Sequence, residues 1–286
     1  MKIGFIGAGK VGFTLGKYLT IRGMEVSGYL SRTREHAQQA AAFTHTKWYD
    51  DLPAILASSD VLFLTVPDDH ITACYQALPG DAIKRKLICH CSGALSAHDA
   101  FPGMEQTGAF GYAVHPLFAV NDPYRSYLEL ADVFFCLEGD PAHQGPLVKL
   151  FADCGNPVQI LSAQNKVRYH AAAAAASNLV VALVDESIEL LTGCGFSRQD
   201  ALKALRPLLL GNMDHLVQDG PAASLTGPVE RGDAVTVGNH LRAMPTKQDR
   251  ELYRLLSRRL VRLAEQKHPA RNYRAICELL EKGEAT

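Results

Sequence analysis

Hydrophobic residues in the first part of the chain form short, nearly continuous runs that alternate with segments of helical spacing. The apolar runs predict buried strands at residues 2–6, 25–30, 61–66, 87–91, 111–114, 133–137 and 158–161. The segments between them predict helices at residues 10–22, 34–42, 52–58, 70–78 and 142–154. Strands that are apolar throughout and alternate with helices are typical of a mostly parallel sheet with both faces covered. The pattern therefore predicts an α/β fold.

The pattern changes after residue 162, where strand-like runs give way to helical spacing. Helices are predicted at residues 164–191, 198–217, 234–242, 247–265 and 270–282. Glycines and prolines separate them, namely Gly193, Gly195, Gly220, Pro221, Pro245 and Pro269. A chain of 286 residues is long enough for two domains. We expect an α/β domain over residues 1–161 and an all-helical domain over residues 162–286.

The first predicted strand leads directly into a glycine-rich turn, within MKIGFIGAGKVG at residues 1–12. The spacing G-x-G-x-x-G between a strand and a helix suits a dinucleotide pyrophosphate, since the glycines permit a tight turn and close backbone approach. The helix N-terminus then offers unpaired amides to the anion. We therefore expect a Rossmann-like domain, although a purely structural glycine turn is the alternative. Its predicted cofactor contacts are Gly7, Ala8, Gly9, Lys10, Val11 and Gly12.

The end of the second predicted strand indicates which dinucleotide binds. Folds that select NAD usually place Asp or Glu there, to accept a hydrogen bond from the ribose 2′-hydroxyl. This chain has Ser31-Arg32-Thr33-Arg34 instead. Hydroxyl and guanidinium groups donate to a 2′-phosphate, so Ser31 and Arg32 predict NADP. The alternative is a solvated turn in which Ser31 or Thr33 caps the next helix.

Composition narrows the class of protein further. The chain has 29 basic and 30 acidic side chains, a balance that gives no sign of a nucleic-acid or anionic-membrane surface. The N-terminus does not resemble a signal peptide, and the apolar stretch at residues 171–184 is shorter than a membrane span. Seven cysteines lie scattered without a C-x-x-C pair, which predicts reduced thiols and no metal site. We expect a cytoplasmic protein.

Candidate chemistry follows the ends of the parallel strands, where ligands bind in open α/β sheets. Thr65, Val66 and Pro67 are placed to contact the nicotinamide ribose, and Ser92 offers a hydroxyl nearby. His115 stands at a strand end before a proline, where an imidazole can donate a proton as hydride arrives. The alternative is a histidine that only bonds a loop carbonyl.

The long helix after the predicted domain boundary carries a polar stripe. Lys166 and His170 are four residues apart and share a face, Ser177 lies two turns further, and Asn178 adjoins it. Burying such groups in an otherwise apolar helix costs free energy unless they are paired. The stripe therefore predicts a face toward a ligand, with Lys166 and His170 as further candidate acids and Asn178 as a substrate contact. A solvated lysine with satisfied core groups is the alternative.

A loop at residues 225–233 combines glycine, proline and charge. Its candidate substrate contacts are Thr226, Gly227, Pro228 and Arg231. The guanidinium suits an anion, and the turn residues suit a shaped loop. The alternative is an interhelical turn with an Arg–Asp pair.

Six segments, in order, resemble a family of oxidoreductases that joins a Rossmann-like domain to a helical domain of unknown function. They are MKIGFIGAGKVG, DVLFLTVPDD, CHCSGAL, AVHPL, YHAAAAAASN and LTGPVERGD. More distantly, the chain resembles pyrroline-5-carboxylate reductase, ketopantoate reductase and the 6-phosphogluconate and β-hydroxyacid dehydrogenases. The resemblance implies NADP and a homodimer formed through the helical domain. In the β-hydroxyacid dehydrogenases a catalytic lysine falls near Lys166, but His170 replaces the asparagine that follows it there.

These observations predict an NADP-dependent oxidoreductase that reduces a small C=O or C=N bond, with the nicotinamide in a cleft between the domains. Two other functions use the same glycine turn. One is a non-catalytic NADP(H)-binding sensor, which needs no proton donor. The other is a deazaflavin-dependent hydride-transfer enzyme.

Overall fold

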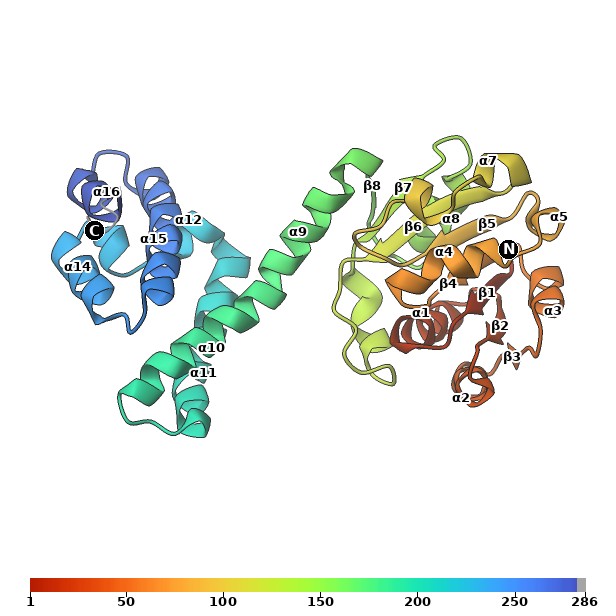
Figure 1. The fold of residues 1–286 in the computed structure, drawn as a ribbon, viewed down its shortest axis with the longest axis horizontal. Helices are drawn as coiled ribbons and strands as arrows, with labels where there is room; N and C mark the ends of the chain where they lie inside the picture. Colours follow the sequence, from red (N-terminus) through yellow and green to blue (C-terminus); the bar gives the residue numbers. More distant parts are fainter. Residues whose placement is uncertain (282–286) are drawn as a thin grey trace. The chain divides into compact units, whose positions relative to one another are not determined.

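A computed structural model describes residues 1–281 as two compact units, the first spanning Met1–Leu179 and the second beginning at Val180. The first unit is built on an eight-stranded sheet of order β3-β2-β1-β4-β5-β6-β7-β8 (Figure 1). The strands are β1 (Ile3–Ile6), β2 (Val26–Leu30), β3 (Lys47–Trp48), β4 (Val61–Leu64), β5 (Leu87–His90), β6 (Phe110–Pro116), β7 (Phe135–Gly139) and β8 (Val158–Ile160).

Neighbouring strands are parallel except for β6 and β7, which are antiparallel. The predicted Rossmann-like, mostly parallel sheet is thus confirmed. All seven predicted strands are present, and β3 is an eighth that the sequence did not reveal, because two residues carry no detectable periodicity. Since β1, β4, β5 and β6 run in the same direction, their carboxyl ends lie along one edge of the sheet.

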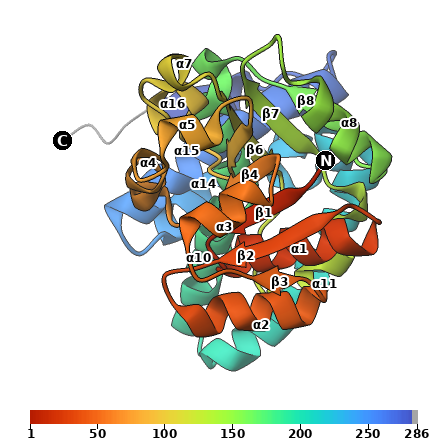
Figure 2. The same cartoon turned by 90° about the vertical axis from the view of Figure 1, so that its right-hand side faces the viewer.

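Apolar side chains leave the sheet on both faces, as expected for strands of this composition. One core contains Phe5, Phe63 and Tyr112, and the other contains Leu62, Leu64 and Ile88. The first face is covered by α1 (Lys10–Ile21), α2 (Arg34–Thr44), η1 (Ser126–Asp132) and α8 (Gly145–Asp153). The second is covered by α3 (Leu52–Ala57), α4 (Asp68–Gln76), α5 (Gly80–Ile83), α6 (Ala97–Ala100) and α7 (Met104–Thr107) (Figure 2).

The helix predicted over residues 164–191 is divided in the structure. A short turn, η2 (Ala163–Asn165), precedes α9 (Lys166–Ala176), and α10 (Asn178–Gly193) follows a break at Ser177. Ser177 leaves helical geometry, with φ of −123° and ψ of −78°, and its hydroxyl donates to the Ala173 carbonyl oxygen at 2.8 Å. Serine side chains compete for backbone groups in this way and bend helices. The first unit includes α9, which bonds to the sheet, and extends beyond the boundary expected near residue 162.

The second unit is helical, and no strand occurs among described residues beyond Ile160. After α10, it contains α11 (Arg198–Asp219), α12 (Pro221–Ser224), α13 (Pro228–Arg231), α14 (Ala234–Ala243), α15 (Lys247–Lys267) and α16 (Arg274–Glu281). Its core includes Val237, Val261 and Ile276. The predicted all-helical part is confirmed, while the predicted end of the last helix at Lys282 lies outside the described residues.

Candidate active site

The glycine-rich turn joins β1 to α1 at the carboxyl edge of the sheet. Gly7 has a φ of +106°, and a Cβ there would lie 2.6 Å from the Thr65 carbonyl oxygen. A Cβ at Gly12 would lie 2.4 Å from Thr65 Oγ1, whose hydroxyl donates to the Gly7 carbonyl oxygen. Around Gly9, by contrast, a Cβ would meet nothing closer than 3.8 Å, and no side chain caps α1. Gly7 and Gly12 are therefore required by packing, whereas Gly9 leaves the helix N-terminus open to an anion.

A cavity of about 790 Å³ opens beside this turn. Residues predicted to bind the cofactor line it from three segments of the chain, namely Gly7, Ala8, Gly9, Ser31, Arg32, Thr65, Val66 and Pro67. Lys10, Val11, Gly12 and Ser92 are not among its lining residues, so their cofactor contacts stay predictions. The volume and the open helix N-terminus fit a dinucleotide.

Arg32 is exposed at the wall of this cavity and, within residues 1–281, makes no ion pair or hydrogen bond. The sequence did not indicate four other polar residues of the lining: His36, Asp50, Asp51 and His70. Both carboxylates are already engaged, because Asp50 lies 3.3 Å from Arg34 and Asp51 caps α3. The free guanidinium of Arg32 is thus available for a 2′-phosphate.

Three hydrogen bonds connect the turn Ser92-Gly93, after β5, to the strand and helices around it. The Ser92 hydroxyl donates to Asp68 Oδ2 at 2.6 Å, and its backbone N–H donates to His90 Nδ1 at 3.1 Å. The Ser92 carbonyl oxygen accepts from Lys166 Nζ at 2.8 Å. These bonds join β5, α4 and α9, so Ser92 holds the turn in place rather than lining the nucleotide cavity.

Two imidazoles converge above Gly93. A Cβ on that glycine would lie 2.6 Å from His170 Nδ1 and 2.9 Å from His115 Nε2. The same two rings are 6.4 Å apart between centroids and are nearly perpendicular. On its other side, His115 Nδ1 is 2.7 Å from the Tyr169 hydroxyl. Sequence reasoning identified both histidines and placed the turn Ser92-Gly93 near the same point, but it missed Tyr169, although Tyr169 stands in the YHAA motif.

The two histidines differ in their surroundings. His115 is half-buried, and burial, followed by the charges of Lys166 and His170, lowers its pKa to about 4. His170 is exposed on α9. An imidazole with such a pKa is uncharged at neutral pH, so His115 offers a hydrogen bond rather than a positive charge.

Lys166 is buried, with 1% of its surface exposed. Burial lowers the pKa of its ammonium group, while Glu138, first among the nearby acidic groups, raises it in part. The side chain lines neither the nucleotide cavity nor the cavity beside His115. Its hydrogen bond to Ser92 indicates a positioning role, and the catalytic role predicted for it remains a prediction.

A second cavity, of about 490 Å³, has His115 and His170 in its wall. The rest of its lining is mostly apolar, with Leu117, Phe118 and the alanines of α9, and it includes Asn178. Ser177 Oγ lies 3.1 Å from Asn178 Oδ1, which leaves the Asn178 amide N–H groups for a ligand. This cavity is suited to a small, mostly uncharged molecule.

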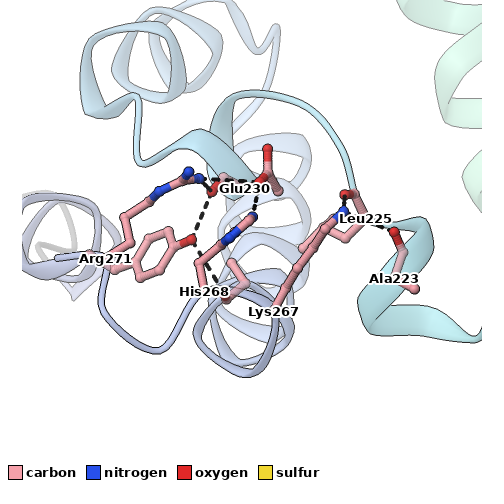
Figure 3. A network of polar contacts seen from close by, with 8 residues as sticks. Ala223, Leu225, Glu230, Lys267, His268 and Arg271 are labelled. Atoms are coloured by element: carbon pink, nitrogen blue, oxygen red, sulfur yellow. Dashed lines mark hydrogen bonds and ion pairs between the residues drawn. The ribbon is translucent and has the colours of Figure 1, made fainter.

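The predicted loop at residues 225–233 belongs to the second unit, where the last residue of α15 and residues that follow it hold the loop (Figure 3). Glu230 bonds through its side chain to His268 and Arg271, and its carbonyl oxygen accepts from the Tyr273 hydroxyl at 2.7 Å. Lys267 Nζ donates to the carbonyl oxygens of Ala223 and Leu225, both at 2.8 Å.

Of the predicted contacts in this loop, Thr226, Gly227 and Pro228 lie at the start of α13, and Arg231 ends that helix. Arg231 is exposed, and its charge helps to lower the pKa of Asp233, after the hydrogen bonds of Thr236. The loop is fixed within its own unit, and its substrate contacts stay a prediction.

The thiols and imidazoles do not form a metal centre in the part of the chain that the structure describes. Cys89 and His90 are buried in β5, and His90 Nδ1 already accepts a hydrogen bond. Burial and the charge of Lys166 lower the pKa of His90 to about 3. All seven cysteines are free.

Two family models match the chain. Residues 2–92 match the NADP oxidoreductase, coenzyme F420-dependent family, and residues 133–260 match a domain of unknown function, DUF2520. A search of curated proteins found no match.

Solved structures share the fold along nearly the whole chain. Protein TM1727 from Thermotoga maritima is 27% identical, with a TM-score of 0.74 over 93% of this chain and 99% of that one. A reductive aminase from Aspergillus terreus in complex with NADPH and ethyl-5-oxohexanoate is 17% identical, with a TM-score of 0.64 over 94% and 99%. An imine reductase from Myxococcus stipitatus in complex with NADP⁺ is 15% identical, with a TM-score of 0.61 over 99% and 100%.

The motifs, the fold and the two family matches agree. The cofactor predicted from Ser31 and Arg32 is the one that the family of the N-terminal domain uses. The chain therefore joins a region that matches the NADP oxidoreductase, coenzyme F420-dependent family to a region that matches DUF2520, and the two matches together identify an oxidoreductase that uses NADP.

Proposed function

We propose that the protein reduces the C=O or C=N bond of a small, uncharged substrate with NADPH. The observation that carries this proposal is the convergence of His115 Nε2 and His170 Nδ1 on one point above Gly93. That point lies at the sheet edge that also carries the glycine turn. Reduction needs a proton at the oxygen or nitrogen when hydride reaches the carbon, and two imidazoles at one point can orient and protonate that atom.

The second cavity supports an uncharged substrate. Its lining has no lysine, arginine or carboxylate among the described residues, and its walls are mostly apolar. Asn178 is proposed to bind a second polar group of the substrate. The substrate contacts of Thr226, Gly227, Pro228 and Arg231 stay a prediction. The keto ester bound to the Aspergillus reductive aminase is also uncharged.

The test follows NADPH absorbance with a panel of small ketones and aldehydes, each with and without a primary amine. We expect NADPH oxidation that requires one of these acceptors, and little with carboxylate-bearing analogues. Tight NADPH binding with no turnover of any acceptor would identify a sensor instead.

A deazaflavin acceptor is a second candidate, because the family matched by residues 2–92 is described as coenzyme F420-dependent. The same assay decides between them when the oxidised deazaflavin replaces the ketone. Faster NADPH oxidation with the deazaflavin than with any carbonyl compound would favour this function.

Cofactor selectivity is expected to depend on Arg32. Arg32→Ala removes a charge-assisted hydrogen bond to the 2′-phosphate, worth about 1.5–3 kcal/mol, so NADPH binding weakens roughly tenfold or more. NADH affinity hardly changes. Titration of each nucleotide by fluorescence measures both, with Arg34→Ala as control, since Arg34 already pairs with Asp50. Equal losses for NADPH and NADH would contradict the assignment.

We also propose a cytoplasmic homodimer that covers apolar side chains on α10 and α11. Val181, Leu208 and Val217 are 70%, 67% and 82% exposed. Residues 163–193 are long and apolar enough to cross a membrane, whereas the sequence analysis expected the apolar stretch at residues 171–184 to be too short. Within this segment, however, Lys166 and Tyr169 form hydrogen bonds with Ser92 and with His115 of the first unit. A second copy is therefore the proposed cover. The free thiols suit a reducing compartment.

Light scattering at micromolar concentration is expected to give twice the monomer mass. Leu208→Asp with Val217→Asp places two charges on the proposed interface and shifts the protein toward monomer. Ile21→Asp, at a residue 52% exposed on the first unit, is the control and leaves the mass unchanged. A wild-type monomer would contradict the assembly.

A further inference from the structure

The hydrogen bond between His115 and Tyr169 has a defined direction. Burial raises the pKa of Tyr169 and of Cys136, so both keep their protons. Cys136 lies opposite His115 on β7, and its thiol helps to raise the pKa of Tyr169. A phenol is a strong donor, and an imidazole nitrogen accepts better than sulfur does. Tyr169 therefore donates to His115 Nδ1, which leaves the ring proton on Nε2, toward Gly93.

The groups around His115 determine its charge state. Titratable side chains from four elements influence His115 or interact with those that do. They are Lys166, Tyr169 and His170 on α9, His90 and Cys91 at β5, Cys136 and Glu138 on β7, and Asp68 on α4. Lys166 and His170 both oppose a charge on His115. This environment therefore favours an uncharged His115 ring that still offers one N–H group as a hydrogen-bond donor.

His170 differs from His115 in its surroundings, because the His170 side chain is exposed to solvent. After His170 gives up its Nδ1 proton, solvent water can supply a new proton directly. In active sites, two titratable groups with opposed environments commonly divide the work of orientation and proton transfer.

We propose that His115 is an uncharged hydrogen-bond donor, oriented by Tyr169, and that His170 delivers the proton. This assignment rests on the proposed function. Bound NADPH supplies the hydride to the substrate carbon. The π-electron pair of the C=O or C=N bond moves to the oxygen or nitrogen, which is held by His115 Nε2–H. That atom takes the proton from the His170 imidazolium, leaving a neutral imidazole and an alcohol or amine. Tyr169 is thus a positioning residue.

The state of His115 is read without a substrate, by ¹⁵N NMR of the histidines at neutral pH. We expect a neutral ring protonated on Nε2. Tyr169→Phe is expected to mix the two tautomers of His115 and leave the other histidines unchanged. The matched control is Tyr253→Phe, because Tyr253 makes the same 2.7 Å bond to His240 Nδ1 in the second unit. If Tyr169→Phe does not fold, the wild-type spectrum still shows whether the His115 proton lies on Nε2 or Nδ1. Cys136→Ala, which keeps Tyr169, is expected to show the same Nε2 tautomer.

The pH dependence of kcat separates the two roles once a substrate turns over. An acid must be protonated, so kcat falls as pH rises through the pKa of the donor. In His170→Asn, kcat falls about 100-fold or more and this high-pH decline disappears. In His115→Asn and Tyr169→Phe the decline remains, and Tyr169→Phe lowers kcat up to about tenfold, the worth of one hydrogen bond.

Two results at the histidines would overturn the assignment. One is a His115 ring that is charged, or protonated on Nδ1, in the wild-type spectrum. The other is a high-pH decline that disappears in His115→Asn and persists in His170→Asn. If no carbonyl or imine is reduced, the proposed function fails, while the NMR result still tests the state of His115 separately.

Discussion

Gly93→Ala is expected to lower kcat by at least about 100-fold, because errors of 1 Å in the placement of catalytic groups have effects of that size. The added Cβ would lie 2.6 Å from His170 Nδ1 and 2.9 Å from His115 Nε2, closer than a carbon atom normally approaches either nitrogen. Both rings must move, and the methyl group also fills the point on which they converge.

NADPH binding is expected to stay within a few-fold of wild type, since Gly93 does not line the nucleotide cavity. Stopped-flow or steady-state rates give kcat, and fluorescence titration gives the dissociation constant. Gly145→Ala is the matched control, because a Cβ at Gly145 would meet nothing within 4 Å. If Gly93→Ala retained kcat within threefold, the reaction would not take place between the two histidines.

The sequence predicted the parts of the fold that depend on local pattern. Strands β1 and β4 are apolar throughout, and the glycines at 7 and 12 are needed where α1 crosses Thr65. These features follow from residues close together in the chain. The sequence did not predict strand β3 or the helix break at Ser177. Strand β3 is too short to show an alternation of apolar and polar residues, and the break depends on one serine side chain.

The candidate site was predicted in its residue types but not in its pairings. His115 and His170 were identified by position, yet their meeting above Gly93 depends on how α9 lies against β5 and β6. Tyr169 lacked a signal of its own, since a tyrosine beside an alanine tract is usually a packing residue. Its partner is 54 positions away in the sequence, and only the fold brings them together.

Lys166 is the residue whose expected role changes most with the structure. Lys166 is only 1% exposed. Its ammonium group donates a hydrogen bond to the Ser92 carbonyl oxygen at 2.8 Å and so fixes the backbone just before Gly93. Removing a buried, charged hydrogen-bond donor costs about 1.5–3 kcal/mol of unfolding free energy. Lys166→Met is therefore expected to destabilise the protein by that amount, as measured by urea unfolding.

Lys166→Met is also expected to change how the free energy of unfolding depends on pH. Burial lowers the pKa of Lys166 below 10.5, so the folded protein loses this proton before the unfolded chain does. The unfolded chain binds more protons between the two pKa values, and the free energy of unfolding rises with pH in that interval. Lys166→Met is expected to lack this rise. The pKa of His115 is expected to increase, since the charge of Lys166 lowers it in the wild type.

Activity then decides between positioning and acid catalysis at Lys166. A proton donor contributes about 100- to 10,000-fold, whereas Lys166→Met is expected to lower kcat by much less and to keep the high-pH decline of kcat. Lys149→Met is the control, because Lys149 is 75% exposed and pairs only with Asp153 in the described structure. A loss of kcat beyond 100-fold, with unfolding free energy and the His115 pKa both unchanged, would make Lys166 the acid and His170 an orienting residue.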